Sequence, residues 1–299
     1  MKPAGLTPFL GLLAASLGAL FGLPSPAAAS RAAGEEEHLG AGPDDARAQH
    51  AKARLIAEHA ALVPGKTVFL GITFDIDPHW HLYWDGLSDT GMPIQVVPEL
   101  PEGYTAGALL WPTPKRLVLP GDLLDYIYED RVTLILPISV PADAKPGEKV
   151  RFAARLDWLV CKDVCLPGAA EVELTLPVAD PDGPAPQRTA DAGRFDETRA
   201  RLPVPASESS PDLSIRWTDN STLTLVARAA TQVTFYPRSD SAALVDPIRE
   251  GTAEGPSLTI TVDRPTPGSG KPTVVSGVLE ATFSDGRKPA YWEIRTTIP

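Results

Sequence analysis

The two cysteines of this 299-residue chain are four positions apart and lie between two runs of strand-like sequence. The run before them, 149–156, alternates roughly between apolar and polar residues, and the run after them, 171–176, alternates cleanly. Alternation with a period of two is typical of β-strands, so the segment predicts an antiparallel hairpin with Cys161 and Cys165 flanking its turn. Facing residues of such a hairpin are about 4.5 to 5.5 Å apart at Cα, within the range that a disulfide requires.

The small loop that a Cys161–Cys165 bond would close bears on what the bond is for. A loop of about five residues contributes about 2 kcal/mol in the chain-entropy model, against about 4.7 kcal/mol for a loop of about 100 residues. A domain of well over about 100 residues buries its own core, and a short bond in a turn is typical of exchangeable disulfides. These magnitudes favour a redox function, and a structural disulfide and metal ligation stay open as alternatives.

Further motifs precede the cysteine motif Trp158-x-x-Cys161-x-x-x-Cys165-x-Pro167 in a set order. They are Asp77-Pro78-His79-Trp80-His81-Leu82-Tyr83-Trp84, Asp89-Thr90-Gly91, Leu100-Pro101-Glu102-Gly103, Trp111-Pro112-x-Pro114 and Tyr126-Ile127-Tyr128-Glu129. Together they make a segment of about 52 to 178 that resembles the N-terminal periplasmic domain of DsbD- and ScsB-type thiol:disulfide interchange proteins. The ordered set is far more specific than any one motif.

The resemblance implies an immunoglobulin-like domain that relays reducing equivalents, with Cys165 as the attacking cysteine and Cys161 as the resolving one. It implies a thioredoxin-fold periplasmic protein as partner, and neither a cofactor nor a resident metal. Family members usually carry a transmembrane electron-transfer domain in the same chain, so we expect here a membrane-embedded electron donor on a separate chain. The alternative function is a non-catalytic periplasmic module that binds a protein partner or copper, with a structural disulfide.

The sequence departs from the family pattern around two of these motifs. His79 stands where members typically have a glycine before the tryptophan, and Leu87-Ser88 replaces a Pro-Gly pair. Ile127 replaces the usual glycine between two tyrosines, and the loop 115–125 is aliphatic where the best-known member covers its disulfide with an aromatic cap. Leu117 to Leu119 are the candidates for shielding the disulfide instead.

The first 29 residues have the pattern of a secretory signal peptide. Lys2 precedes an apolar run from Pro8 to Leu23, and Ala27-Ala28-Ala29 forms a small-residue cleavage site. A membrane anchor is the alternative, but the run is short for a span and lacks a charged stop on its far side. We therefore expect a periplasmic protein whose mature chain has no membrane span, in a compartment that permits disulfides.

The charge of the chain argues against two classes of partner. The net charge is −11, and removal of Lys2 with the signal peptide makes it more negative. An acidic chain is a poor match for nucleic acid or for an anionic membrane surface. No Gly-rich phosphate loop, Ser/His/Asp arrangement or paired-carboxylate motif rises above chance either.

Proline, glycine and strand spacing predict an all-β protein of two domains. The resemblance implies that the first is an immunoglobulin-like β-sandwich, and the strand spacing after it predicts a second, smaller β-sandwich domain. The chain has 32 prolines and 24 glycines, which suits β-rich domains better than helical ones. The expected divisions are a signal peptide at 1–29, a flexible leader at 30–50, the redox domain at 51–180, a linker at 181–190, and a cysteine-free second domain at 191–299.

Strand-like runs fill both domains. In the first domain they lie at 68–76 and 131–140, besides the cysteine hairpin. At 54–60 propensity favours a helix, but Pro64-Gly65 follows immediately and the resemblance implies a first strand, so we expect a strand there. The second domain has a short helix predicted from about Asp191 to Arg201. Strands are then predicted at 213–217, 222–227, 232–236, 257–262, 274–283 and 291–297, with Asp285-Gly286 as a hairpin turn before the last of them.

The aromatic segment from Trp80 to Trp84 contains two histidines. Alternation points Trp80, Leu82 and Trp84 toward a sandwich core and leaves His79, His81 and Tyr83 on the opposite face. Core packing is therefore favoured for this segment. A copper or zinc site would arise only if the two histidines lay beside the cysteines.

Overall fold

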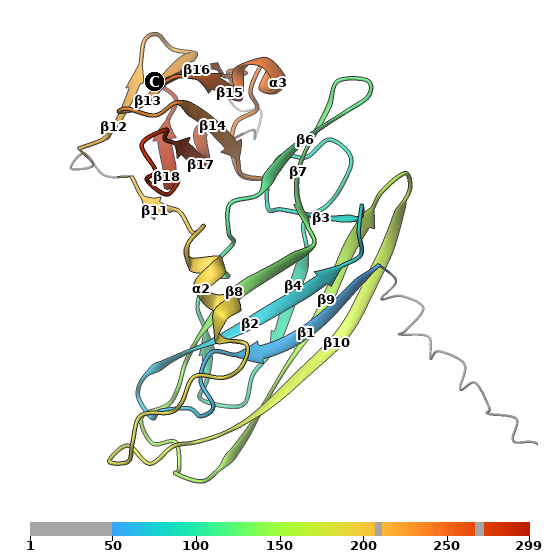
Figure 1. Cartoon of the computed structure of the whole chain (residues 1–299), viewed down its shortest axis with the longest axis vertical. Helices are drawn as coiled ribbons and strands as arrows, with labels where there is room; N and C mark the ends of the chain where they lie inside the picture. Colours follow the sequence, from blue (N-terminus) through green and yellow to red (C-terminus); the bar gives the residue numbers. More distant parts are fainter. Residues whose placement is uncertain (1–49, 207–210, 267–271) are drawn as a thin grey trace, which may run out of the picture. The chain divides into compact units, whose positions relative to one another are not determined.

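The computed structural model describes residues 50–206, 211–266 and 272–299, and nearly all of its regular structure is β-strand (Figure 1). The predicted signal peptide and all but the last residue of the predicted leader lie outside the described residues. Among the described helices, none has both the length and the apolar character needed to span a bilayer.

Two antiparallel sheets make up the part of the chain that carries the cysteines. Their strands are β1 (Ala51–Ala57), β2 (Thr67–Ile76), β3 (His81–Tyr83), β4 (Gln95–Glu99), β5 (Thr105–Ala106), β6 (Lys115–Leu119), β7 (Leu123–Glu129), β8 (Arg131–Ser139), β9 (Lys149–Cys161) and β10 (Cys165–Pro177). One sheet has the order β1-β2-β8-β5, and the other has the order β10-β9-β3-β7-β6 with β4 paired to β9. The strands predicted at 68–76 and 131–140 are confirmed, and the first strand begins three residues earlier than predicted.

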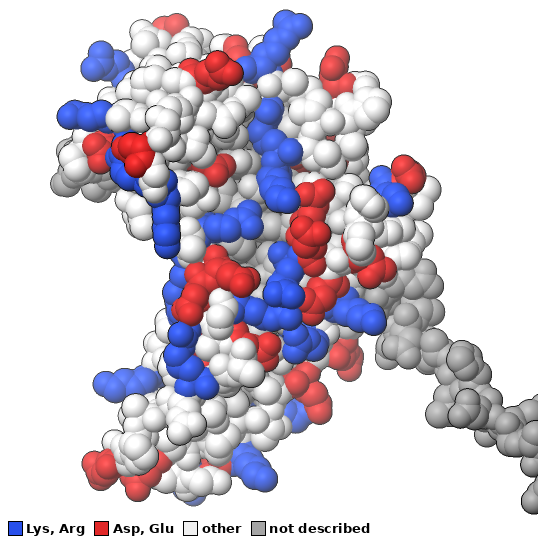
Figure 2. Space-filling view, viewed as in Figure 1, with Lys and Arg blue, Asp and Glu red and all other residues white. Residues whose placement is uncertain are grey.

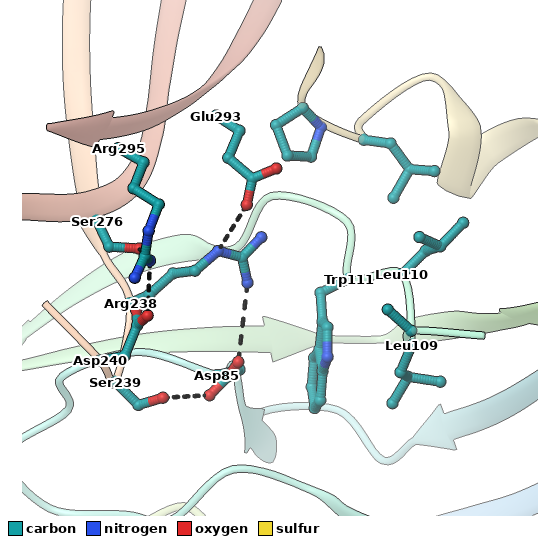
Figure 3. A pocket seen from close by; sticks show the side chains of 13 residues that line it. Asp85, Leu109, Leu110, Trp111, Arg238, Ser239, Asp240, Ser276, Glu293 and Arg295 are labelled. Atoms are coloured by element: carbon teal, nitrogen blue, oxygen red, sulfur yellow. Dashed lines mark hydrogen bonds and ion pairs between the residues drawn. The ribbon is translucent and has the colours of Figure 1, made fainter. Parts of the chain in front are cut away.

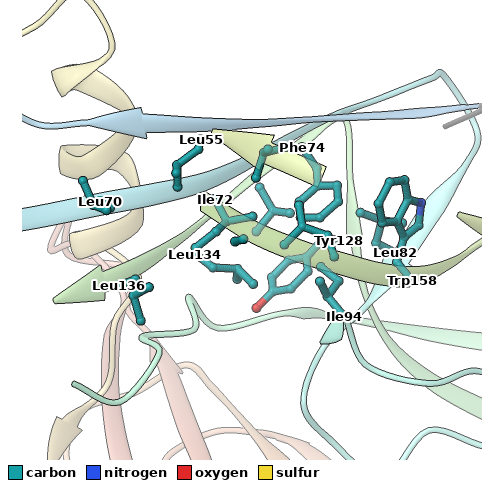
Figure 4. Close-up of a cluster of buried hydrophobic side chains, with 14 of the residues drawn as sticks. Leu55, Leu70, Ile72, Phe74, Leu82, Ile94, Tyr128, Leu134, Leu136 and Trp158 are labelled. Atoms are coloured by element: carbon teal, nitrogen blue, oxygen red, sulfur yellow. The ribbon is translucent and has the colours of Figure 1, made fainter. Parts of the chain in front are cut away.

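The core between these sheets follows from the alternation of their strands. Along β9 every second side chain is buried, with Phe152 and Trp158 among them. The Trp158 ring meets Phe74 of β2 edge to face, with the ring centroids 5.1 Å apart (Figure 4). Leu82 and Trp84 join the same core as predicted, and each large apolar side chain buried in this way contributes about 1.5 to 3 kcal/mol.

The C-terminal part of the chain has its own sheets and its own core. Its strands are β11 (Val204–Pro205), β12 (Leu213–Trp217), β13 (Thr222–Ala227), β14 (Gln232–Pro237), β15 (Thr252–Glu254), β16 (Ser257–Thr261), β17 (Val274–Thr282) and β18 (Ala290–Thr297). They form a sheet of order β11-β18-β17-β14-β15 and a sheet of order β12-β13-β16 around a second hydrophobic cluster. All six strands predicted here are confirmed.

The turn predicted at Asp285-Gly286 connects β17 to β18, which pair antiparallel from Ala281↔Ala290 to Val274↔Thr297. Gly286 has a φ of 84°, a conformation that glycine adopts without the steric cost of a Cβ atom. The local Asp-Gly signal therefore identified this hairpin correctly.

The predicted helix is α2 (Ala192–Arg199), and it packs on the sheet that contains β1 and β8. Phe195 is fully buried in a small cluster with Ile56 and Ile135. The Thr198 hydroxyl donates to the Thr133 carbonyl at 2.8 Å. The sequence had grouped this helix with the second domain, whereas its contacts here are with the first sheet, and the boundary near residue 180 stays a prediction.

Candidate functional site

The two cysteines form the last pair of a long hairpin. β9 and β10 have 13 residues each and pair in one continuous register from Lys149↔Pro177 to Cys161↔Cys165. A disulfide joins the two cysteines, with their Cα atoms 4.1 Å apart. The predicted hairpin and the predicted bond are both confirmed, and the alternating sequence on either side of the pair explains why they meet.

The two sulfur-bearing residues differ sharply in exposure. Cys161 is 2% exposed, whereas Cys165 is exposed. Val164, the turn residue just before Cys165, is 61% exposed. An external reactant therefore approaches this disulfide from the Cys165 side.

Cys161 is buried under side chains from three other strands. Tyr83 of β3 and Ile127 of β7 are buried against it, and Leu117 of β6 packs on the same cluster. These three residues are called the cover of Cys161 below. The segment 115–125, expected to be a loop, is a hairpin of β6 and β7, and Leu117 is the member of the predicted shielding group 117–119 that packs here.

A chain of hydrogen bonds beside the disulfide leads from Tyr83 to a buried carboxylate. The Tyr83 hydroxyl lies 3.8 Å from Cys165 Sγ and 3.0 Å from Thr90 Oγ1. Thr90 donates its hydroxyl proton to Asp125 Oδ2 at 2.5 Å and its backbone N–H to Asp125 Oδ1 at 3.0 Å. Because the Thr90 hydroxyl has one proton, it accepts from Tyr83, which orients the Tyr83 oxygen beside the sulfur.

His81 lies on the other side of the Tyr83 hydroxyl. Its Nε2 atom is 3.3 Å from that oxygen, and the residue is paired with Cys161 between β3 and β9. Burial lowers the pKa of His81, against an opposing effect of the nearby Asp125 and Glu129 carboxylates. Burial also raises the pKa of Tyr83, so both side chains are neutral near pH 7 beside the disulfide.

Gly91 brings the Asp89-Thr90-Gly91 motif up to the Tyr83 ring. A Cβ atom at this position would lie 2.0 Å from Tyr83 Cζ. Asp89 also accepts from the Leu124 N–H at 2.7 Å, which joins the motif to β7. The motif therefore fixes Thr90 between Tyr83 and Asp125.

The two histidines considered as metal ligands are in different surroundings. His81 is buried beside Cys161, while His79 is exposed and has a φ of 70°. Within the described ranges, no group of three or more His, Cys, Asp or Glu side chains is arranged to hold a metal ion. The sulfurs themselves are bonded to each other.

A cavity of about 440 Å³ lies away from the disulfide (Figure 3). Trp111, Leu109 and Leu110 form an apolar wall opposite the charged side chains that Figure 3 labels. Those charges are paired with one another, for example Arg295 with Asp240 at 2.8 Å. On the face drawn in Figure 2, basic and acidic side chains are likewise interspersed.

Comparison with known proteins identifies the cysteine-bearing segment. Residues 52–177 match the family described as "Thiol:disulfide interchange protein DsbD, N-terminal". No curated protein matches the chain. The structure is similar to the N-terminal periplasmic domain of ScsB from Proteus mirabilis, with a TM-score of 0.52 and 18% identity, over 84% of this chain and 95% of that one.

A second solved structure among the matches is the DsbD N-terminal domain from Neisseria meningitidis in the reduced form. It has a TM-score of 0.25 and 13% identity, over 45% of this chain and 89% of that one. The likeness to the Proteus mirabilis domain shows a shared fold.

Proposed function

Because residues 52–177 form a DsbD-type N-terminal domain, we propose that this protein relays reducing equivalents through Cys161 and Cys165 to an extracytoplasmic acceptor. The pair would be reduced by a membrane-embedded donor on a separate chain, and a thioredoxin-fold periplasmic protein would be its partner. Membership of the segment in a thiol–disulfide interchange family supports this relay, as does the periplasmic location in the name of the ScsB domain.

The observation that carries the proposal is the unequal exposure of the two cysteines. A relay needs one sulfur that partners reach and a second sulfur close enough to expel them. Cys165 is exposed and Cys161 is 2% exposed in the same bond. This difference supports Cys165 as the attacking cysteine and Cys161 as the resolving one.

Each half of the relay is a pair of thiol–disulfide exchanges. In the reductive half, a donor thiolate attacks Cys165 Sγ, a mixed disulfide forms, and Cys161 leaves as a thiolate. The second donor thiolate then attacks the donor sulfur of the mixed disulfide and releases Cys165. The donor loses two electrons, the pair gains two electrons and two protons, and the acceptor half runs the same steps in reverse.

The hydroxyl network lies where these charges change. Tyr83 is 3.8 Å from Cys165 Sγ and is held by Thr90 and the buried Asp125 carboxylate. A neutral Tyr83 and a neutral His81 add no charge of their own beside the two sulfurs. Because Tyr83 donates its one proton to Thr90, the Cys165 thiolate would rely on its solvent exposure rather than on a hydrogen bond from Tyr83.

A redox titration tests the proposal. The full mature chain is equilibrated in glutathione or dithiothreitol buffers of stepped potential, and the oxidised fraction is measured by thiol labelling and mass spectrometry. A relay should equilibrate between about −180 and −270 mV, the range of thiol–disulfide exchange proteins. A reduction potential of the Cys161–Cys165 bond below about −300 mV would instead favour the binding module with a structural disulfide.

A further inference from the structure

The strands that carry the cover of Cys161 each have a second, opposite face. Successive residues of a strand point to opposite sides of the sheet. The neighbours of Tyr83, Leu117 and Ile127 therefore face away from the disulfide. These neighbours are Trp84, Arg116 and Tyr126.

All three of these neighbours contact the C-terminal part of the chain. Trp84 and Tyr126 meet Tyr236 of β14 edge to face, with ring centroids 6.4 and 5.8 Å apart. The Arg238 guanidinium lies 5.3 Å above the Trp84 ring. Tyr236 is 4% exposed and belongs to the same core cluster as Trp84, so solvent is excluded from this contact.

Arg116 makes the polar contact of this set. Its Nη2 atom donates to the carbonyl oxygens of Pro247 and Ile248 at 2.8 and 3.0 Å. Both carbonyls belong to α3 (Pro247–Glu250), a single turn of helix. The Pro247 carbonyl also accepts the backbone N–H of Gly251 at 3.1 Å, so it uses both of its lone pairs. A guanidinium binds such carbonyl oxygens with charge-assisted hydrogen bonds.

β6 depends on such a contact because it is the edge strand of its sheet. It pairs with β7 on one side, where Arg116 is opposite Tyr126 and Leu117 is opposite Asp125. Edge elements held by few contacts are the ones that open locally in a folded protein. Loss of the Arg116 contact would therefore release Leu117 from the cluster that buries Cys161 more readily than it would unfold the sandwich.

We propose that Arg116 is a positioning residue for thiol–disulfide exchange. By tying β6 to the carbonyls of α3, it holds Leu117 against the cluster of Tyr83 and Ile127 that buries Cys161, and so confines attack to Cys165. The C-terminal part of the chain thereby sets which sulfur a partner reaches. The consequence for electron transfer rests on the proposed function, but the restraint itself concerns only the accessibility of Cys161.

Alkylation of the reduced full chain tests this role. After reduction and removal of the reductant, limiting iodoacetamide is added, and the labelling rate of each cysteine is followed by peptide mass spectrometry. Arg116→Ala should raise the labelling rate of Cys161 about tenfold, equivalent to about 1.4 kcal/mol of lost restraint, and leave that of Cys165 within about twofold. Arg116→Lys, which keeps the charge but loses the planar donor pair, should give a smaller rise.

A matched variant separates the restraint from general destabilisation. Arg199→Ala breaks the ion pair between Arg199 and Glu58, whose charged atoms are 2.6 Å apart. Arg199 belongs to α2 and Glu58 follows β1, so neither residue is part of the cover of Cys161. It should lower the free energy of unfolding without changing the labelling of Cys161. Equal labelling of Cys161 in wild type and Arg116→Ala would overturn the proposal, as would an equal rise in Arg199→Ala.

The outcome is separable from that of the redox titration. If the disulfide resists reduction at physiological potentials, the relay is wrong. The labelling rates of Cys161 and Cys165 can still be compared after reduction with a strong reductant. Should Arg116→Ala fail to fold by circular dichroism, Arg116→Lys decides alone. A Cys161 rate in Arg116→Lys equal to that of wild type then overturns the proposal.

Discussion

His81 lies directly opposite Cys161 where β3 pairs with β9, so that a titratable ring is built into the wall of the disulfide site. The residue is 6% exposed, and its Nε2 atom is 3.3 Å from the Tyr83 hydroxyl. The stability of the site therefore depends on the protonation state of the His81 ring, and so on pH.

The direction of that dependence follows from the burial of His81, which lowers its pKa below the ordinary value of 6.5. As the pH falls through 6.5, His81 binds a proton in the unfolded chain but not yet in the folded chain. The free energy of unfolding therefore decreases from about pH 6.5 down to the pKa of His81 in the folded chain. We expect the free energy of unfolding in urea to fall between pH 7.5 and 5.5, and His81→Gln to flatten this slope. An unchanged slope in the variant would contradict the assignment.

Local patterns predicted the strands and the cysteine hairpin because their causes are local. Alternating burial, the Asp285-Gly286 turn and the spacing of Cys161 and Cys165 are all readable within about ten residues of sequence. The position of β3 between β9 and β7 is a property of the sheet order, and no local pattern specifies it. Local alternation therefore predicted the side of the strand on which His81 lies. It could not predict that His81 pairs with Cys161.

The Tyr83–Thr90–Asp125 network was missed for a related reason. Asp125 stands inside an otherwise apolar run, 123–128, and a charged residue in a buried strand is a signal that its carboxylate has partners. Its partner, Thr90, is 35 residues earlier in the chain, in the motif Asp89-Thr90-Gly91. The pairing depends on the loop after β3 returning to β7, which is again a long-range property of the fold.

The disulfide itself should matter little to the stability of the fold. It closes a turn at the end of a hairpin that 13 residue pairs already hold, and its small loop limits the entropic gain to about 2 kcal/mol. The double variant Cys161→Ser with Cys165→Ser should remain folded and lose at most about 2 kcal/mol in denaturant unfolding. A loss of 4 kcal/mol or more would rule out redox exchange as the main reason for the bond.

Gly91→Ala should disturb the site through Tyr83. The added methyl group would meet the Tyr83 ring at 2.0 Å, so the ring must move away from Cys165 and Thr90 at a cost of about 1 to 3 kcal/mol. Gly193→Ala in α2 is the matched control, because no atom lies within 4 Å of its added Cβ. That variant should stabilise the helix by up to about 1 kcal/mol. Equal unfolding free energies for the two variants would refute the role given to Gly91.

The assignment of roles to the two cysteines predicts different fates for their single variants. In the relay, Cys165 attacks the partner and Cys161 then expels it, so a chain without Cys161 cannot complete the second exchange. Cys161→Ser, expressed from the full 299-residue sequence, should accumulate a covalent adduct with a thioredoxin-fold periplasmic protein. The adduct should disappear on addition of dithiothreitol.

Cys165→Ser is the matched control, because its remaining sulfur belongs to Cys161, which is 2% exposed under Tyr83, Leu117 and Ile127. We expect no adduct from this variant on non-reducing gels followed by mass spectrometry. Adducts on Cys165→Ser alone would reverse the two roles. Adducts on neither variant, together with a wild-type bond that resists reduction, would replace the relay with a binding module, because an exchanging pair cannot transfer electrons without passing through a mixed disulfide.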